Sequence, residues 1–437
     1  MAKEKPINAG VPGGETPEPP AKEPSSPAKK TKPGQRRPIP LPLKLIGAAV
    51  IAATAFVVIA ILGGSGAEES AGPGPSPVSN ESGGRSGNPA AQASEELGYP
   101  AFATSNTTRV GGGDPAANAA GVALATFPSG DDSQKPDAVV LVDEDDWGAA
   151  IAASVLVADP VRAPVLISSE EMPDATAQAL EALDPQGSKA TGGAQAFAIG
   201  EVTDPDGLRT TRVQGSNPAA VAAKVAKLRD RLFDKPPSSV VVVPAGKAGF
   251  AMPAAAWAAR SGDPVLLSGR DKLPKPSSAA LKRYPDARVF VLGPPSAIST
   301  KAFREIAKIN GKVRRVSGED PVANSIAFAR YDNGEFGWNI NDPGHGFVVA
   351  RDDEPLNAAA AAPLSASGTW GPLLLSDDAD TLPKALRGYF LDVKPGYTDD
   401  PTRAFYNHVW VIGDQEAIDV KQQGEIDELA ELAKIGQ

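Results

Sequence analysis

Short apolar runs alternate with alanine-rich stretches through residues 99–437 of the chain. The apolar runs have the length of buried strands, and the alanine-rich stretches are typical of helices. The expected strands form three sets: Val139–Val142, Val240–Val243 and Phe347–Ala350; Pro164–Ser168, Pro264–Ser268 and Pro372–Ser376; Ala196–Gly200, Val289–Gly293 and Val409–Gly413. The expected helices include Gly148–Val157, Ala251–Ala259 and Asn357–Ala366. This alternation predicts an α/β fold whose parallel sheets are covered by helices on both faces.

One sequence unit occurs three times at a fixed spacing. Its opening reads TRVGGGDPAANAAGVA at residues 108–123, TRVQGSNPAAVAAKVA at 211–226 and RRVSGEDPVANSIAFA at 314–329. Arg109, Arg212 and Arg315 are therefore separated by 103 residues and again by 103. In each copy an Asp or Asn precedes a Pro, which predicts a helix with an N-cap residue and Pro at its first position. We expect three Rossmann-like lobes in tandem, with right-handed crossovers.

The longest apolar run precedes the repeats. Residues 45–62 hold eighteen apolar or small residues without a charge, enough to cross the hydrocarbon core of a bilayer. We expect a single-pass signal anchor, against a cleaved signal peptide or a buried core helix as alternatives. The chain then divides into a disordered basic cytoplasmic tail (1–44), the anchor (45–62), a Gly/Ser/Pro-rich linker (63–98) and repeat lobes at 99–202, 203–308 and 309–437.

These ordered motifs resemble the cell wall binding repeat 2 modules of Gram-positive surface proteins. Arg109, Arg212 and Arg315 stand where that family has the arginine of its helix-opening motif, and Gly200, Gly293 and Gly413 end the matching strand. The resemblance implies a pseudo-threefold assembly of flavodoxin-like lobes that attaches non-covalently to anionic cell-wall polymers. The chain departs from the family where Pro-Ala or Pro-Val replaces Arg-Tyr after the helix-start residue. The family's Asp-Ala-Leu motif is best matched by Asn357-Ala-Ala.

The three equivalent arginines are the first candidate ligand-binding residues. An arginine beside a helix N-terminus forms an anion site from its own bidentate donors and the free backbone amides. Arg109, Arg212 and Arg315 would then line one polymer groove or three separate ones. The structural alternative is that each arginine pairs with a carboxylate of a neighbouring lobe, and it is favoured because Asp114 and Glu319 lie close and repel an anionic ligand.

The third copy carries longer, aromatic-rich loops than the other two. These segments read YDNGEFGWNINDPGHG and GYFLDVKPGYTDDPTRAFYNH, and they hold both histidines of the chain. Long loops with aromatic side chains are frequent binding sites for sugars and peptides. Trp338, Tyr397, Tyr406 and His408 are therefore the second set of candidates, against the alternative that they pack the loops onto their own lobe.

Composition and charge narrow the function. The chain has no Cys and two His, which leaves no thiol chemistry and little basis for a metal centre. Residues 1–44 carry a net charge of +5 and the rest of the chain −15, which argues against nucleic acid and against bulk attraction to polyanions. Acidic runs at 143–146 and 351–354 suit solvated loops, with cation binding as the alternative. No nucleotide-binding or hydrolase motif is present, so we expect no cofactor.

The sequence therefore predicts a non-catalytic, outward-facing surface protein of a Gram-positive-type envelope. We expect its repeat region to bind cell-wall glycan or an anionic wall polymer. The alternatives are an envelope scaffold that binds a protein partner through the loops of the third copy and a glycan-processing enzyme, which would need a pair of carboxylates that the sequence does not single out.

Overall fold

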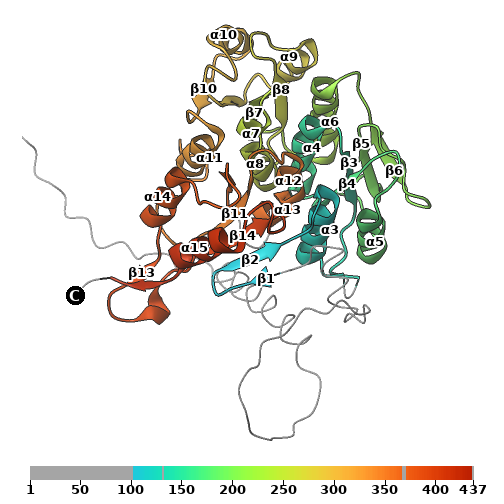
Figure 1. The fold of residues 1–437 in the computed structure, drawn as a ribbon. Helices are drawn as coiled ribbons and strands as arrows, with labels where there is room; N and C mark the ends of the chain where they lie inside the picture. Colours follow the sequence, from blue (N-terminus) through green and yellow to red (C-terminus); the bar gives the residue numbers. More distant parts are fainter. Residues whose placement is uncertain (1–101, 130–131, 367–370, 436–437) are drawn as a thin grey trace, which may run out of the picture. The chain divides into compact units, whose positions relative to one another are not determined.

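The structure, a computed structural model, describes residues 102–129, 132–366 and 371–435. All of them belong to one unit, residues 66–437. Their fold is α/β with parallel sheets, as the sequence predicts (Figure 1). The expected tail, membrane anchor and linker all lie outside the described residues. Within those residues, no helix combines the length and the apolar character that a membrane span requires.

Three sheets of the described chain share one strand order. The first sheet is ordered β4 (Val165–Ser168), β3 (Val139–Asp143), β5 (Ala196–Ile199) and β6 (Thr210–Val213). The second is ordered β8 (Val265–Ser268), β7 (Ser239–Pro244), β9 (Arg288–Leu292) and β10 (Val313–Val316). The third is ordered β12 (Leu373–Ser376), β11 (Gly346–Arg351), β14 (His408–Ile412), β2 (Thr107–Val110) and β1 (Phe102–Ala103). Neighbours are parallel except β1 and β2.

The third sheet is completed by the beginning of the repeat region. Strand β2 pairs in parallel with β14, and Arg109 lies opposite Val411. In the other two sheets the same position is taken by the strand that opens the next copy, β6 beside β5 and β10 beside β9. Each motif arginine therefore lies on a strand that pairs with a strand of a different copy. The third sheet needs residues about 300 apart in sequence to form.

Helices connect and cover the strands. Their bounds are α3 (Pro115–Thr126), α4 (Trp147–Ala153), α5 (Asp174–Leu183), α6 (Pro218–Leu232), α7 (Ala248–Ala251), α8 (Pro253–Ser261), α9 (Lys275–Leu281), α10 (Thr300–Ile309), α11 (Pro321–Arg330), α12 (Leu356–Ala360), α13 (Ala362–Ala366), α14 (Lys384–Asp392) and α15 (Val420–Ala430). Two 3₁₀ turns, η1 (Ser154–Val157) and η2 (Pro401–Arg403), and a two-stranded sheet of β13 (Gly396–Tyr397) and β15 (Ala433–Lys434) complete the described chain.

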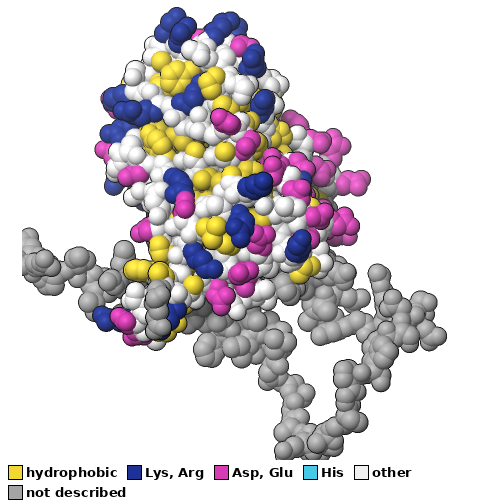
Figure 2. Space-filling view, turned by 60° about the vertical axis from the view of Figure 1, so that its left-hand side comes forward, with side chains coloured by type: hydrophobic (Ala, Val, Ile, Leu, Met, Phe, Trp, Pro, Cys, Tyr) yellow, Lys and Arg dark blue, Asp and Glu magenta, His cyan; other side chains and the backbone are white. Residues whose placement is uncertain are grey.

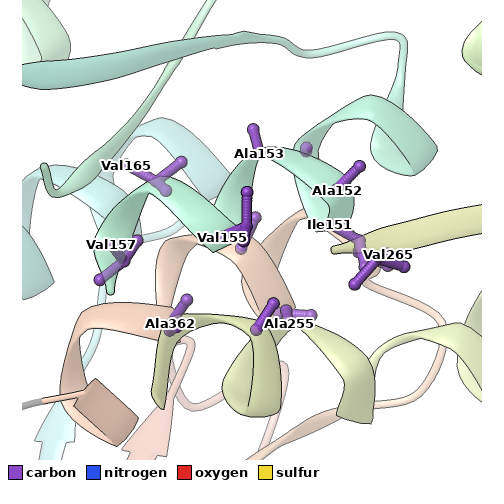
Figure 3. Packing of buried hydrophobic residues seen from close by; sticks show 14 of the residues in the cluster. Ile151, Ala152, Ala153, Val155, Val157, Val165, Ala255, Val265 and Ala362 are labelled. Carbon is purple, nitrogen blue, oxygen red and sulfur yellow. The ribbon is translucent and has the colours of Figure 1, made fainter. Parts of the chain in front are cut away.

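The alanine-rich helices form the centre of the largest hydrophobic core. Figure 3 shows residues of η1, α8 and α13 facing one another, among them Val155, Ala255 and Ala362. All three side chains are nearly inaccessible to water. Small alanine side chains let these helices approach closely, and the dense contacts between them supply dispersion and hydrophobic stabilisation. The core therefore joins helices from all three copies.

The helix starts form as the sequence predicts. Asp114 accepts a hydrogen bond from the backbone amide of Ala117 at 2.8 Å, Asn217 from Ala220 at 3.0 Å and Asp320 from Ala323 at 2.7 Å. No larger residue fits at position 112, because a Cβ on Gly112 would lie 2.6 Å from the Cβ of Ala117. This close approach places the end of β2 directly against α3.

Candidate functional site

Arg109 is buried and held by the third sheet. Its side chain is 2% exposed. Nη1 donates to the carbonyl oxygens of Gly413 at 2.8 Å and Asp414 at 2.6 Å, and Nε donates to Oε1 of Gln423 at 2.8 Å. Burial lowers the pKa of the guanidinium to about 10, although Asp414 opposes the shift. Among the described residues, the buried Nη2 has no hydrogen-bond partner.

Arg212 and Arg315 also bind the loops that follow a neighbouring strand. Arg212 donates to the carbonyl of Val202 at 3.0 Å and pairs with Asp204 at 2.7 Å, and its side chain is 37% exposed. Arg315 donates to the carbonyls of Gly293 and Ile298. The three arginines lie on three different sheets and are not brought into one groove. Of the three, only Arg212 forms an ion pair in the described chain, and its partner Asp204 belongs to the same copy rather than to a neighbouring one. Backbone carbonyls are the partners that all three arginines share.

The aromatic candidates are also dispersed. Trp338 is half-buried and packs edge-on against Trp257, with ring centroids 5.5 Å apart. His408 begins β14 and lies 3.1 Å from the hydroxyl of Thr108, and burial lowers its pKa. Tyr397 is half-buried in β13, whereas Tyr406 is 57% exposed and donates to the carbonyl of Pro401.

A cleft of about 380 Å³ opens where strands of the first and third sheets end. Its walls come from the start of α3, the loop after β3, the loop after β11 and the loop after β14. The lining residues are Gly112, Gly113, Asp114, Pro115, Asn118, Glu144, Trp147, Asp353, Glu354, Pro355, Leu356, Gly413, Asp414 and Ala417. Ligands of open α/β sheets bind at the carboxyl ends of strands, so the cleft is the candidate site that the fold itself favours.

The charged groups that line the cleft are all acidic. Five carboxylates line it, at positions 114, 144, 353, 354 and 414, and no lysine or arginine does. Asp114 caps α3, Asp353 pairs with Arg351 at 3.0 Å, and Asp414 accepts from the amide of Glu416. The side chain of Glu144 is exposed, and its carboxylate makes no hydrogen bond or ion pair with another described residue. The cleft therefore offers acceptors to a ligand.

A chain of buried amides supports the cleft. The amide of Gly112 donates to Oδ1 of Asn118 at 2.9 Å, and Nδ2 of Asn118 donates to Oδ1 of Asn357 at 3.2 Å. Asn357 in turn donates to Oε2 of Glu354 at 2.6 Å. Burial and the charge of Asp353 raise the pKa of Glu354. These bonds link α3 of the first copy to α12 of the third and fix the carboxylate of Glu354 at the cleft wall.

A basic face lies over α9, α10 and β10. Residues 270–315 carry 12 basic and 3 acidic side chains, a net charge of +9, whereas the rest of residues 45–437 sums to −24. Lys301, Arg304 and Lys308 are exposed and recur on one side of α10, and none makes an ion pair within the described chain. Figure 2 shows Lys and Arg gathered at the end of the unit where α9 and α10 lie in Figure 1.

Sequence reasoning missed both features for different reasons. The summed charge of −15 concealed a basic segment in the second copy, which a count over successive windows would have found. The cleft depends on four loops that are distant in sequence, and its acidic runs read as solvated loops. No group of three or more potential metal ligands is assembled within the described residues.

Comparison with known proteins supports the resemblance for the second copy. Residues 212–303 match the family model of cell wall binding domain 2 (CWB2). The match runs from Arg212 in β6 to the first turn of α10, and so includes part of the basic face. The match supports a surface protein that is associated with the cell wall.

Two solved structures have a fold similar to that of this chain. Cwp8 from Clostridium difficile is 20% identical with a TM-score of 0.58, and 75% of this chain aligns with 52% of that one. Cwp6 from Clostridium difficile is 16% identical with a TM-score of 0.59, and 75% of this chain aligns with 48% of that one. The chain thus spans about half the length of both structures. No curated protein sequence matches it.

Proposed function

We propose that this protein is a non-catalytic surface protein that binds an anionic polymer of the cell wall through the basic face over α9, α10 and β10. The observation that carries the proposal is the separation of charge: a net +9 over residues 270–315 beside −24 over the rest of residues 45–437. The CWB2 match over residues 212–303 supports the cell wall as the location of the ligand.

The chemistry of α10 suits a flexible polyanion. Lys301, Arg304 and Lys308 are three and four residues apart, so their charges form a stripe along the helix. Side chains without internal carboxylate partners lose little when they bind phosphate or carboxylate groups of a polymer. Arg314, exposed on β10, extends the same face of positive charge. Binding of this kind releases counterions and weakens as salt rises.

The motif arginines have a different role in this proposal. The guanidinium groups of Arg109 and Arg315 donate hydrogen bonds to backbone carbonyls of the loops that follow strands. The guanidinium group of Arg212 donates to the carbonyl of Val202 and pairs with Asp204. We propose that they position these loops and touch no polymer.

The wider arrangement that we propose is three Rossmann-like lobes related by pseudo-threefold symmetry. The shared strand order of the three sheets supports it.

We also propose that residues 45–62 anchor the protein in the membrane, with the repeats outside. The uninterrupted apolar run and the basic residues before it support this arrangement. A fusion of alkaline phosphatase after residue 98 tests it: activity is expected only if residue 98 is outside the cytoplasm. An inactive, stably produced fusion contradicts it.

The binding proposal is tested by sedimentation of the full chain with purified sacculi. We expect the protein to pellet with sacculi that keep their anionic polymers and to stay in solution with sacculi from which acid has removed them. The pelleted fraction should fall as salt rises from 50 to 500 mM. Equal pelleting with stripped sacculi contradicts the proposal.

An exposed aromatic pair favours a protein scaffold as the second candidate function. Phe405 is 69% exposed and Tyr406 57% exposed on the loop before β14. Aromatic side chains with this exposure are frequent anchors of protein interfaces. Loss of a co-purifying envelope protein after F405S/Y406S, with sacculus binding unchanged, would establish this second role.

A further inference from the structure

The starts of α3, α6 and α11 are equivalent in sequence, but the residues that lie against them differ. Strand register sets the correspondence, because Asp143, Pro244 and Arg351 pair with the serines that end β4, β8 and β12. Counting onward from these residues, Glu144 corresponds to Ala245 and Asp352, and Trp147 corresponds to Ala248 and Pro355. A tryptophan therefore occurs at this position in one copy of the three.

Two of the three helix starts are closed by direct packing. A Cβ on Gly148 would lie 3.4 Å from the Cβ of Pro218, the first residue of α6. A Cβ on Gly249 would lie 2.9 Å from the Cβ of Pro321, the first residue of α11. At the start of α3 the corresponding residue is Leu356, which lines the cleft together with Pro115. The third copy therefore has a leucine, Leu356, at the position where the other two copies have a glycine that packs against a proline.

We propose that this cleft is a second binding site, present once per chain, for a neutral or amine-bearing sugar unit. Its volume of about 380 Å³ falls within the range of about 300–1,000 Å³ typical of small-molecule sites. Trp147 supplies an aromatic surface for the apolar face of a sugar ring, and Glu144 supplies a free carboxylate. Hydroxyl groups and a protonated amine donate to carboxylates, whereas phosphate groups are repelled by them.

This site is independent of the basic face, because the two surfaces have opposite charge and come from different elements. The basic face comes from α9, α10 and β10, and the cleft is built by the start of α3 and the loops after β3, β11 and β14. The protein would then hold an anionic polymer and a neutral or cationic sugar at the same time.

Isothermal titration of the full chain tests the site. The probes are an oligomer of β-linked glucosamine, its N-acetylated counterpart and glycerol phosphate. We expect one site per chain, about tenfold tighter binding of the free amine than of the N-acetylated oligomer, and no competition by glycerol phosphate. E144Q should remove the preference for the amine and keep the binding of the N-acetylated oligomer. W147A should lower the affinity for both oligomers at least tenfold.

The matched control is D352N, which changes the position of the third copy that corresponds to Glu144 and does not line the cleft. It should leave the affinity for both oligomers unchanged, and circular dichroism verifies that each variant is folded. Two or three sites per chain, an equal loss in D352N and E144Q, or tighter binding of glycerol phosphate would overturn the proposal. If the unmodified protein binds the oligomers but does not pellet with sacculi, only the basic-face proposal is contradicted.

Discussion

Nη1 of Arg109 donates to the carbonyl oxygens of Gly413 at 2.8 Å and Asp414 at 2.6 Å. These two bonds join β2, the strand that opens the repeat region, to the loop after β14. Nearby, the backbone amide of Asn106 donates to Asp427 at 2.7 Å. The first and the third copies are therefore held together by hydrogen bonds as well as by strand pairing, and the cleft lies along this connection.

Arg109→Ala should therefore destabilise the fold far more than Arg212→Ala. Removing the buried guanidinium leaves carbonyl oxygens and Gln423 without a donor, which costs about 2–4 kcal/mol. Arg212 is a matched control from the same motif, and its exposed contacts contribute less than about 1 kcal/mol. Urea unfolding measures both changes in the free energy of unfolding. Equal destabilisation by the two variants would contradict this ranking.

Asn118→Val should destabilise the connection between α3 and α12. Valine fits the position, because Val221 occupies it in the second copy. The change leaves the amide of Gly112 and Oδ1 of Asn357 without a hydrogen bond, at a cost of about 1–3 kcal/mol. Asn341→Val, at an exposed position, should change the free energy of unfolding by less than about 0.5 kcal/mol. If N118V unfolds at the same urea concentration as the parent, the amide chain does not support the cleft.

Asp263 should make stability depend on pH. The carboxylate is 3% exposed and accepts from Nε1 of Trp257 at 3.0 Å, and burial raises its pKa to about 6. The unfolded value is about 3.9, so the folded state binds the proton more tightly. The resulting stability is complete below about pH 4 and is lost as pH rises through about 6, by about 3 kcal/mol. Urea unfolding from pH 4 to 7.5 should show this decline in the parent and lose it in D263N. Parallel pH profiles of the two proteins would contradict the assignment.

The sequence contained enough information for the elements and the sheet type, because each depends on local pattern. The apolar run at Val139–Val142 and the caps at Asp114, Asn217 and Asp320 form as predicted. The pairing of β2 with β14 could not be predicted from local sequence, since each motif strand could pair within its own copy or with another. Trp147 likewise gains its place in the cleft only when the loops of two sheets meet.

The candidate residues show the same limit. A spacing of 103 residues identified Arg109, Arg212 and Arg315 as equivalent, but pattern alone does not tell whether a guanidinium faces a ligand or a carbonyl. Trp338 stood out as a loop aromatic, and it packs on Trp257 of the second copy. In contrast, Lys301, Arg304 and Lys308 form a helical stripe that the sequence already contains.

Charge reversal on α10 tests the central claim most directly. The variant K301E/R304E/K308E is compared with K189E/R403E/K421E, which makes the same change of charge at exposed positions outside the basic face. Binding of each full-length protein to sacculi with intact anionic polymers is measured by sedimentation at 100 mM salt. The account predicts at least a tenfold loss of affinity for the α10 variant and less than a threefold loss for the control. Equal affinities of the two variants would contradict it.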